Sequence, residues 1–238
     1  MWNGKKVSVI FPTYNEKDSI YGAIEDFFAS GYVDEVVVIN NNAAAGTEEE
    51  VARTRARQVF ESEQGYGFAI RRGFKEVDEE SEYIIVSEPD GTFAGRDVLK
   101  LLAYADEFDF VLGTRTSREF IWAGANMGRF LKWGNWAVAK MVELLFNTTL
   151  LTDVGCTMRL IRKEALKKIE PLFTVGSSHF GPHMTLLIIT NNLRLVEIPV
   201  NYRARVGESS VTGSKIKAFF LGMIMIKLVI THRLKTMF

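Results

Sequence analysis

The chain has 238 residues, enough for one large domain or for a domain with an appendage. Its 29 basic and 29 acidic residues balance to a net charge of zero, which argues against a broad nucleic-acid-binding surface. Cys156 is the only cysteine, which excludes an intrachain disulfide and a zinc site built from cysteines.

Strand-like and helix-like patterns alternate through the first half of the chain. Five apolar runs have the length and composition of buried strands: residues 6–11, 35–39, 58–61, 83–87 and 108–113. Helical patterns lie between them, at residues 18–30, 48–57, 68–77 and 97–104. Asp18 or Ser19 is expected to cap the first of these helices, and Gly65 and Gly67 precede the third. The alternation predicts an α/β fold with a mostly parallel, doubly wound sheet.

Two carboxylates follow the fourth of these strands. The chain there is Glu88-Pro89-Asp90-Gly91, and Pro89 cannot donate to a sheet ladder, so the chain should leave the sheet. Glu88 and Asp90 are then presented beyond the carboxyl edge of a strand, where open α/β sheets bind ligands. Paired acidic oxygens suit a hard divalent cation such as Mg²⁺ or Mn²⁺. A solvated turn is the alternative interpretation of so short a motif.

Two common nucleotide-binding motifs are absent from the positions that they require. The dinucleotide fingerprint needs G-x-G-x-x-G after the first strand, and here Pro12 begins a different segment. Gly65 and Gly67 are followed by Ile70 at the third glycine position, and no phosphate-binding P-loop occurs. Dehydrogenase and NTPase functions are therefore disfavoured.

A series of short motifs keeps a fixed order over most of the chain. The motifs are residues 12–16 (PTYNE), 40–41 (NN), 46–47 (GT), 88–90 (EPD), 113–115 (GTR), 152–159 (TDVGCTMR), 197–202 (EIPVNY) and 205–210 (RVGESS). The series resembles that of family-two glycosyltransferases, and its later motifs resemble the polyprenyl-phosphate glycosyltransferases related to dolichol-phosphate mannose synthase. The resemblance implies a GT-A (nucleotide-diphospho-sugar transferase) fold over residues 1–212, followed by a C-terminal amphipathic helix in residues 213–238.

The resemblance implies that the acidic pair holds Mg²⁺ or Mn²⁺ against the diphosphate of a nucleotide sugar. The metal would offset the charge that grows on the leaving group. Asp90 is the main expected ligand, and Glu88 would assist on the metal or on a ribose hydroxyl. The residues expected to bind the nucleotide sugar are Pro12, Tyr14, Glu16, Ile39, Asn41, Gly67, Glu88 and Arg205. The base is not predicted, because Asn41 can donate as well as accept where the family usually has Asp.

The same resemblance assigns residues to the acceptor. Arg115 and Arg129 match positions that bind a lipid phosphate in the family. A guanidinium suits this role, because it can bind phosphate through two parallel hydrogen bonds. Ser209 is expected to contact the same phosphate. Asp90, Asp153 and Arg115 form the expected catalytic set. A phosphate monoester is already anionic at pH 7, so Asp153 would orient groups or aid metal binding, and would act as a base only for a hydroxyl acceptor. Transfer would be a direct displacement with inversion.

Two apolar segments suggest how such a protein could meet a bilayer. Residues 127–146 and 218–226 are strongly apolar with basic residues within or beside them, and both fit helices lying in a membrane interface. Packing on the sheet is the alternative. No segment reaches the roughly 20 apolar residues needed to span a bilayer. The expectation is therefore a peripheral protein at the cytoplasmic face, because the apolar run at residues 7–11 is too short for a signal peptide.

Other functions remain open at this point. A saccharide hydroxyl could be the acceptor in place of a polyprenyl phosphate. A catalytically silent nucleotide-sugar-binding module is a further alternative, because Asn40, Asn41, Glu88 and His183 depart from the family pattern. A nucleotidyltransferase is disfavoured, since its Gly-rich first loop is missing.

Overall fold

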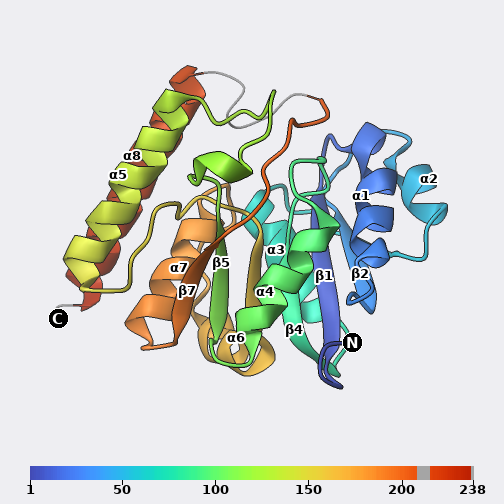
Figure 1. Cartoon of the computed structure of the whole chain (residues 1–238), viewed down its shortest axis with the longest axis horizontal. Coiled ribbons are helices and arrows are strands. Elements are labelled where there is room, and N and C mark those ends of the chain that lie inside the picture. Colours follow the sequence, from blue (N-terminus) through green and yellow to red (C-terminus); the bar gives the residue numbers. More distant parts are fainter. Residues whose placement is uncertain (208–214, 237–238) are drawn as a thin grey trace.

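The computed structural model describes residues 1–207 and 215–236, and within them helices cover both faces of one sheet (Figure 1). The strands are β1 (Lys6–Thr13), β2 (Glu35–Asn40), β3 (Arg57–Phe60), β4 (Ser81–Val86), β5 (Phe110–Thr114), β6 (Arg159–Arg162) and β7 (Leu195–Pro199). The α-helices are α1 (Lys17–Ala29), α2 (Thr47–Ala52), α3 (Tyr66–Glu76), α4 (Val98–Ala105), α5 (Arg129–Phe146), α6 (Lys163–Ile169), α7 (Phe180–Thr190) and α8 (Lys215–Thr236). Short 3₁₀ turns are η1 (Gly95–Asp97), η2 (Arg118–Phe120) and η3 (Glu170–Leu172).

The sheet is mostly parallel, which confirms the predicted α/β class. Its strand order is β3-β2-β1-β4-β6-β5-β7, and only β6 runs antiparallel to its neighbours β4 and β5 among the described strands. β6 was not predicted, because four residues with arginine at each end lack the apolar length of a buried strand. β6 positions the site, because its antiparallel direction brings the preceding loop to the carboxyl end of β5. There the Gly113 N–H donates to the Met158 carbonyl at 3.0 Å.

The start of the first helix differs from the prediction. α1 begins at Lys17 with Glu16 at its N-cap, so neither Asp18 nor Ser19 caps it. The Glu16 carboxylate turns back toward the strand instead, where its Oε2 accepts the Tyr14 N–H at 2.7 Å. Glu16 is therefore held at the end of β1, facing the carboxyl edge of the sheet.

The second helix is shorter than predicted. It ends at Ala52, although the helical pattern continues to residue 57. Thr54 explains the end, because its Oγ1 donates to the Val51 carbonyl at 2.7 Å and accepts the Ala56 N–H at 3.1 Å. A side chain that bonds the local backbone in this way competes with the helical pattern.

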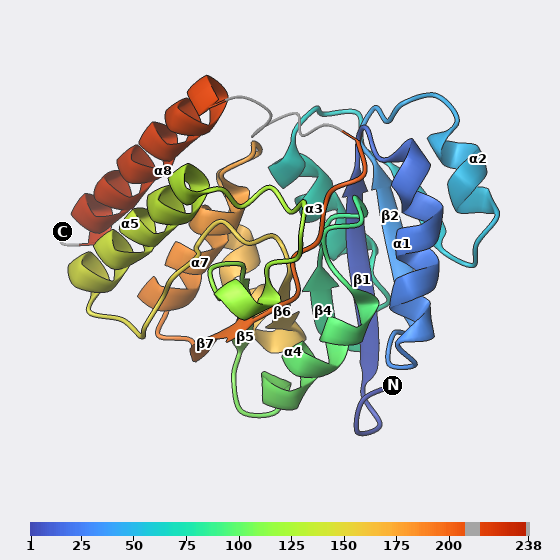
Figure 2. The same cartoon turned by 45° about the horizontal axis from the view of Figure 1, so that its top comes forward.

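Alternate side chains of β1 pack against helices on opposite faces of the sheet. The Phe11 ring meets Phe27 of α1 edge-on, with centroids 4.9 Å apart. On the other face, Gly73 of α3 lies so close to Ile10 that an added Cβ would meet that side chain at 2.4 Å. Successive strand residues point to opposite faces, so α1 and α3 lie on opposite faces, as Figure 2 shows. The buried apolar strands form the core and leave the carboxyl edge for polar side chains.

Helices α5 and α8 lie side by side at the end of the molecule farthest from α1 and α2 (Figures 1 and 2). Each buries one face, through Val138 and Val142 of α5 and through Met225 and Val229 of α8. The two helices also expose large apolar side chains: Phe130, Trp133, Trp136, Leu144, Phe219, Phe220, Met223, Ile224, Ile230 and Leu234. Among the described residues, no helix combines the length and apolar character needed to cross a membrane.

Candidate active site

Three carboxylates surround one guanidinium at the carboxyl edge of the sheet. Arg205, which follows β7, donates from Nη2 to Glu16 Oε1 at 2.6 Å and from Nη1 to Asp90 Oδ2 at 2.7 Å. Glu88 Oε2 lies 3.7 Å from the same Nη1. Glu16 follows β1, and Glu88 and Asp90 follow the neighbouring strand β4. The ends of adjacent parallel strands therefore deliver the three negative charges to one place.

Asp90 is held on both of its carboxylate oxygens. Its Oδ1 accepts the Thr92 N–H at 2.9 Å and the Thr92 hydroxyl at 2.5 Å, while Oδ2 accepts from Arg205. Gly91 has a φ of +81°, a left-handed conformation that glycine adopts at little cost, and so the chain can fold back over the carboxylate. The carboxylate is thus fixed in orientation within a buried turn.

The Glu88 carboxylate has fewer polar contacts within the described residues than the Asp90 carboxylate has. Burial first, and then the charge of Asp90, raise the pKa of Glu88 to about 8. A second cation nearby would favour the ionised form. No three His, Cys, Asp or Glu side chains in the described part of the chain are arranged as a metal cage. Mg²⁺ is usually bound by one or two carboxylates and completed by substrate phosphates, so the Asp90 and Glu88 oxygens fit that donor set.

A second ion pair lies at the end of β5. Arg115 donates to Asp153 through Nε at 2.8 Å and through Nη2 at 2.9 Å, which is the two-bond geometry of an arginine–carboxylate pair. Asp153 is fully buried, and its Oδ1 also accepts the Gly155 N–H. The Glu197 carboxylate of β7 accepts the Asp153 N–H at 2.8 Å. Asp153 therefore orients Arg115, and both of its carboxylate oxygens accept hydrogen bonds.

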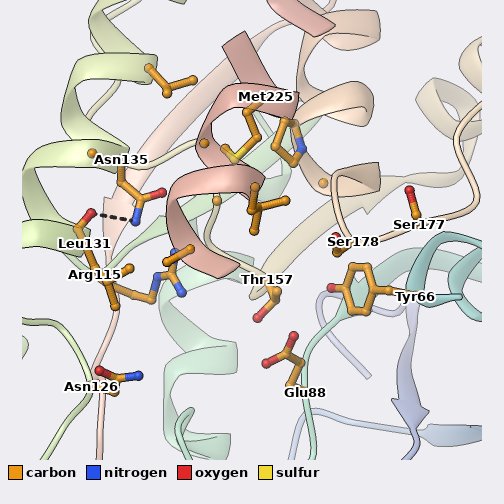
Figure 3. Close-up of a pocket in the computed structure, with 18 of the residues that line it drawn as sticks. Tyr66, Glu88, Arg115, Asn126, Leu131, Asn135, Thr157, Ser177, Ser178 and Met225 are labelled. Atoms are coloured by element: carbon orange, nitrogen blue, oxygen red, sulfur yellow. Dashed lines mark hydrogen bonds between the residues drawn. The ribbon is translucent and has the colours of Figure 1, made fainter. Parts of the chain in front are cut away.

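One cavity of about 830 Å³ joins these groups. Its polar end is lined by residues that include Glu16, Glu88, Arg115 and Arg205. Its apolar end lies between α5 and α8, where the lining includes Phe130, Leu131, Val138, Met141, Phe219, Leu221, Met225 and Ile226. Figure 3 shows Arg115, Glu88, Tyr66 and Thr157 around the cavity, with Leu131 and Met225 on the two helices.

The profile of the family described as Glycosyl transferase family 2 matches residues 8–170. The chain belongs to this family. The dolichyl-phosphate hexose transferase of Haloferax volcanii is 27% identical to this glycosyltransferase over 209 residues, which cover 86% of each protein. Glycosyltransferase AglJ of the same organism is 32% identical over 110 residues, which cover 46% of this chain and 36% of that protein.

Solved structures of known glycosyltransferases share the fold. Glucosyl-3-phosphoglycerate synthase from Mycobacterium tuberculosis, in complex with Mn²⁺, UDP and phosphoglyceric acid, aligns with a TM-score of 0.75 at 14% identity, covering 97% of this chain and 79% of that one. The same enzyme in complex with Mg²⁺ and UDP aligns with a TM-score of 0.73 at 13% identity, covering 96% of this chain and 79% of that one. The likeness shows that this glycosyltransferase has the GT-A fold.

Most of the predicted site residues of this glycosyltransferase meet at the cavity. Those that line it are Pro12, Tyr14, Glu16, Asn41, Glu88, Arg115 and Arg205. Asp90 is not part of the lining, but its carboxylate binds Arg205, which is. In the same way, Asp153 binds the lining residue Arg115. The structure thus brings residues from six separate sequence motifs together, and their roles toward a substrate stay predictions.

Besides Asp90 and Asp153, three of the predicted residues that the structure describes are absent from the cavity lining. Ile39 is fully buried in β2, and Arg129 is exposed at the start of α5. Gly67 packs so closely on the backbone of Gly176 that a Cβ would approach it to 2.7 Å, which gives this glycine a packing role. Ser209 lies outside the described residues.

The amide of Asn41 is bonded to the protein's own backbone. Its Nδ2 donates to the carbonyls of Glu61 and Glu63 at 2.9 and 2.8 Å, and its Oδ1 accepts the Gly65 N–H at 2.8 Å. These contacts hold the loop that leads into α3. Asn41 therefore shapes one wall of the cavity, whatever it contacts in a bound nucleotide.

The sequence assigned no role to Tyr66, Thr157 or Asn135, although all three line the cavity. Tyr66 is the first residue of α3 and lies between Gly65 and Gly67, and Thr157 lies in the segment that contains Asp153. Only their position beside known motifs could have indicated that Tyr66 and Thr157 line the cavity. The direction in which each side chain points depends on tertiary packing, which a sequence pattern does not encode.

Proposed function

We propose that this glycosyltransferase moves a hexose from a nucleotide-diphosphate sugar to a polyprenyl phosphate, with inversion at the anomeric carbon and with Mg²⁺ or Mn²⁺ as cofactor. The observation that carries the proposal is the single cavity, which joins a carboxylate cluster to Arg115 and then to an apolar space between α5 and α8. A dolichyl-phosphate hexose transferase that matches over 86% of both proteins supports the acceptor class.

The donor would bind at the carboxylate cluster. Asp90 and Glu88 would hold the divalent metal, which supplies charge stabilisation for the departing diphosphate. In the related synthase the crystals contain Mn²⁺ or Mg²⁺ together with UDP, which supports the same donor arrangement here. Arg205 links Glu16 to Asp90 and lines the cavity, so its guanidinium is positioned to contact a diphosphate oxygen.

The acceptor phosphate would bind at Arg115. Asp153 holds one edge of the guanidinium through Nε and Nη2, so Arg115 presents its other three N–H groups in a fixed direction. A phosphate monoester has a second pKa of about 6 and carries an anionic oxygen at pH 7. That oxygen can attack the anomeric carbon without a general base, and placement of the reactants would supply most of the rate. The engaged oxygens of Asp153 therefore favour a phosphate acceptor over a saccharide hydroxyl.

The prenyl chain would lie in the apolar end of the cavity. We further propose that residues 1–212 belong to the catalytic domain and that α8, within the C-terminal segment 213–238, lies in the interface of a membrane, at its cytoplasmic face. The exposed Trp133 and Trp136 of α5 and the exposed Phe219 and Phe220 of α8 support this arrangement. Aromatic side chains of this kind are typical of interfacial helices.

The test is a transfer assay that separates the products by phase. Labelled UDP- and GDP-hexoses would be incubated with the protein, Mn²⁺ and a polyprenyl phosphate, and then extracted with organic solvent. We expect label in the organic phase with at least one donor, dependent on the lipid phosphate and lost when the metal is chelated. Label that stays in water with every donor would contradict the proposal. Hydrolysis of the donor without transfer would favour a different acceptor.

A further inference from the structure

Glu197 of β7 binds the short segment that carries Asp153. Its Oε1 accepts the Asp153 N–H at 2.8 Å, and its Oε2 accepts the Thr152 N–H at 2.8 Å and the Thr152 hydroxyl at 2.7 Å. Glu197 begins one of the sequence motifs, yet the sequence assigned it no role. It does not line the cavity, so any effect of Glu197 on a substrate must pass through other residues.

The Glu197 carboxylate and this segment stabilise each other. Burial raises the pKa of Glu197, and the hydrogen bonds from Thr152 and Asp153 oppose that shift. A carboxylate that is removed from water destabilises the fold unless its oxygens are hydrogen-bonded, and here the segment supplies the donors. In return, two N–H groups outside regular secondary structure gain acceptors. Residues 152 and 153 are therefore held at a fixed place beside β7.

Asp153 passes this position on to the side chain of Arg115. Its carboxylate accepts from the guanidinium through Nε at 2.8 Å and Nη2 at 2.9 Å, and it also accepts the Arg115 backbone N–H at 3.1 Å. Figure 3 shows the Arg115 side chain extended into the cavity. The backbone of Asp153 is thus bound to Glu197, while its side chain is bound to Arg115. A shift of the first contact would move the second.

Thr152 acts on the backbone on either side of Arg115. Its hydroxyl oxygen lies 2.8 Å from Thr114 Oγ1 and 2.7 Å from Thr116 Oγ1. Because a carboxylate can only accept, the Thr152 proton goes to Glu197, and the Thr152 oxygen is left to accept from the other hydroxyls. The direction of this hydroxyl network therefore also depends on Glu197. The two threonines flank Arg115 at the end of β5.

We propose that Glu197 is a positioning residue for the acceptor phosphate. It holds Thr152 and Asp153, and through them it fixes both the guanidinium and the backbone of Arg115. This inference rests on the proposed function, in which Arg115 binds the phosphate of the lipid. Because that reaction needs no general base, its rate depends on how well the reactants are placed. A guanidinium whose direction is fixed before the lipid arrives would supply that placement.

The test measures transfer with a polyprenyl phosphate as the varied acceptor, at saturating donor and Mn²⁺. Glu197→Gln keeps the size of the side chain and replaces one accepting oxygen by a donating amide. We expect kcat/KM for the lipid phosphate to fall about tenfold. Affinity for free UDP or GDP, whichever the wild-type protein binds, should change less than about twofold, because Glu197 does not contact the proposed donor groups.

Glu35→Gln is the matched control. Glu35 is also a strand carboxylate that accepts a backbone N–H and a hydroxyl, from Asp78 at 3.0 Å and from Ser8 at 2.6 Å. It is the first residue of β2, so it lies at the amino edge of the sheet, opposite the cavity. Transfer by Glu35→Gln should stay close to that of the wild-type protein.

A double variant separates positioning from general stability. If Glu197 acts through Arg115, adding Glu197→Gln to Arg115→Lys should cost no more than about twofold in kcat/KM for the lipid phosphate. Residues that act independently have additive effects, so a further loss of roughly tenfold in the double variant would overturn the positioning role.

The outcomes distinguish this inference from the proposed function. Unchanged kcat/KM for the lipid phosphate in Glu197→Gln, with an active wild-type protein, would overturn the inference alone. Wild-type protein that transfers no hexose to the polyprenyl phosphate would overturn both. Retained affinity for the free nucleotide shows that a variant is folded. If Glu197→Gln does not fold, Thr152→Val removes only the shared hydroxyl and is judged by the same two criteria.

Discussion

The two ends of the cavity are built in different ways. The polar end is made from strand ends and the loops that follow them, and two of its charges are fixed by buried partners, Asp90 by Thr92 and Arg115 by Asp153. The apolar end is made from two helices outside the sheet, which bury one face and expose the other. Fixed charges suit the stabilisation of a departing diphosphate. An apolar space that opens between exposed helices suits a long prenyl chain. The comparison suggests that chemistry and lipid binding can be separated by mutation.

The largest expected effect lies at the polar end. Asp90→Asn keeps the bond from Thr92 but removes the negative charge from the proposed metal site. We expect a loss of at least about a thousandfold in the rate of hexose transfer, because charge stabilisation by a metal is worth several kcal/mol. Transfer would be measured with Mn²⁺ at saturating donor. Near-normal activity of Asp90→Asn would show that this acidic motif does not hold the metal.

A substitution at Arg115, between the polar and apolar ends of the cavity, should have a smaller effect on transfer. Arg115→Lys keeps the positive charge and removes the two-bond contact with Asp153. We expect kcat/KM for the lipid phosphate to fall roughly 10- to 100-fold, while affinity for free UDP or GDP changes less than twofold. Arg194→Lys, at an exposed arginine, is the control. An equal loss of nucleotide affinity in Arg115→Lys would mean that Arg115 serves the donor instead.

The apolar end can be altered without touching the charges. Replacing Trp133 and Trp136 by Ala removes two exposed aromatic side chains from α5. Binding to anionic vesicles in a flotation assay should weaken by about tenfold or more. Nucleotide binding should not change, because the proposed donor site lies at the other end of the cavity. A double alanine variant of the exposed Leu99 and Tyr104 on α4 is the matched control. Equal flotation of all three proteins would contradict the membrane surface.

A change of pH tests how α8 is attached. His183 of α7 is buried beside His232 of α8, with ring centroids 6.4 Å apart, and burial first lowers the pKa of His183 to about 4. In the unfolded chain the imidazole of His183 has its ordinary pKa of about 6.5. Between pH 6.5 and 4 the unfolded chain therefore binds more protons than the folded chain. The free energy of unfolding should therefore fall as the pH drops through this window, by on the order of 2 kcal/mol.

Thermal unfolding measured from pH 7 to pH 4.5 tests this attachment. In His183→Gln the acid-dependent loss of stability should be smaller, although the variant can be less stable at pH 7. The same substitution at the half-exposed His179 should leave most of the acid-dependent loss in place. Identical pH profiles for His183→Gln and the wild-type protein would contradict the burial of a neutral His183.

The sequence predicted the polar end better than the apolar end. The apolar runs that form β1, β2, β4 and β5 were recognisable because a parallel strand buried on both faces is apolar along its whole length. Pro89 marked the point where Glu88 and Asp90 leave the sheet. The ion pair between Arg205 and Glu16 was not predictable from any local pattern, since 189 positions separate the two residues.

The remaining parts of the site depend on tertiary packing. β6 is too short to give a strand pattern, yet it determines where Thr157 lies. Arg129 and Arg115 look equivalent in the sequence, but one is exposed and the other is bound to a buried carboxylate. The helical patterns around α5 and α8 left core packing and membrane contact equally open. The structure assigns core packing to one face of each helix and leaves the other face exposed.

The most direct test of the account compares a lipid phosphate with a water-soluble one. Purified protein would be given the same labelled donor and Mn²⁺, with either a long-chain polyprenyl phosphate or glycerol 3-phosphate as acceptor. We expect transfer to the polyprenyl phosphate at a kcat/KM at least about a hundredfold higher, because only that acceptor fills the space between α5 and α8. Equal transfer to both acceptors, or transfer to glycerol 3-phosphate alone, would contradict a cavity built for a lipid.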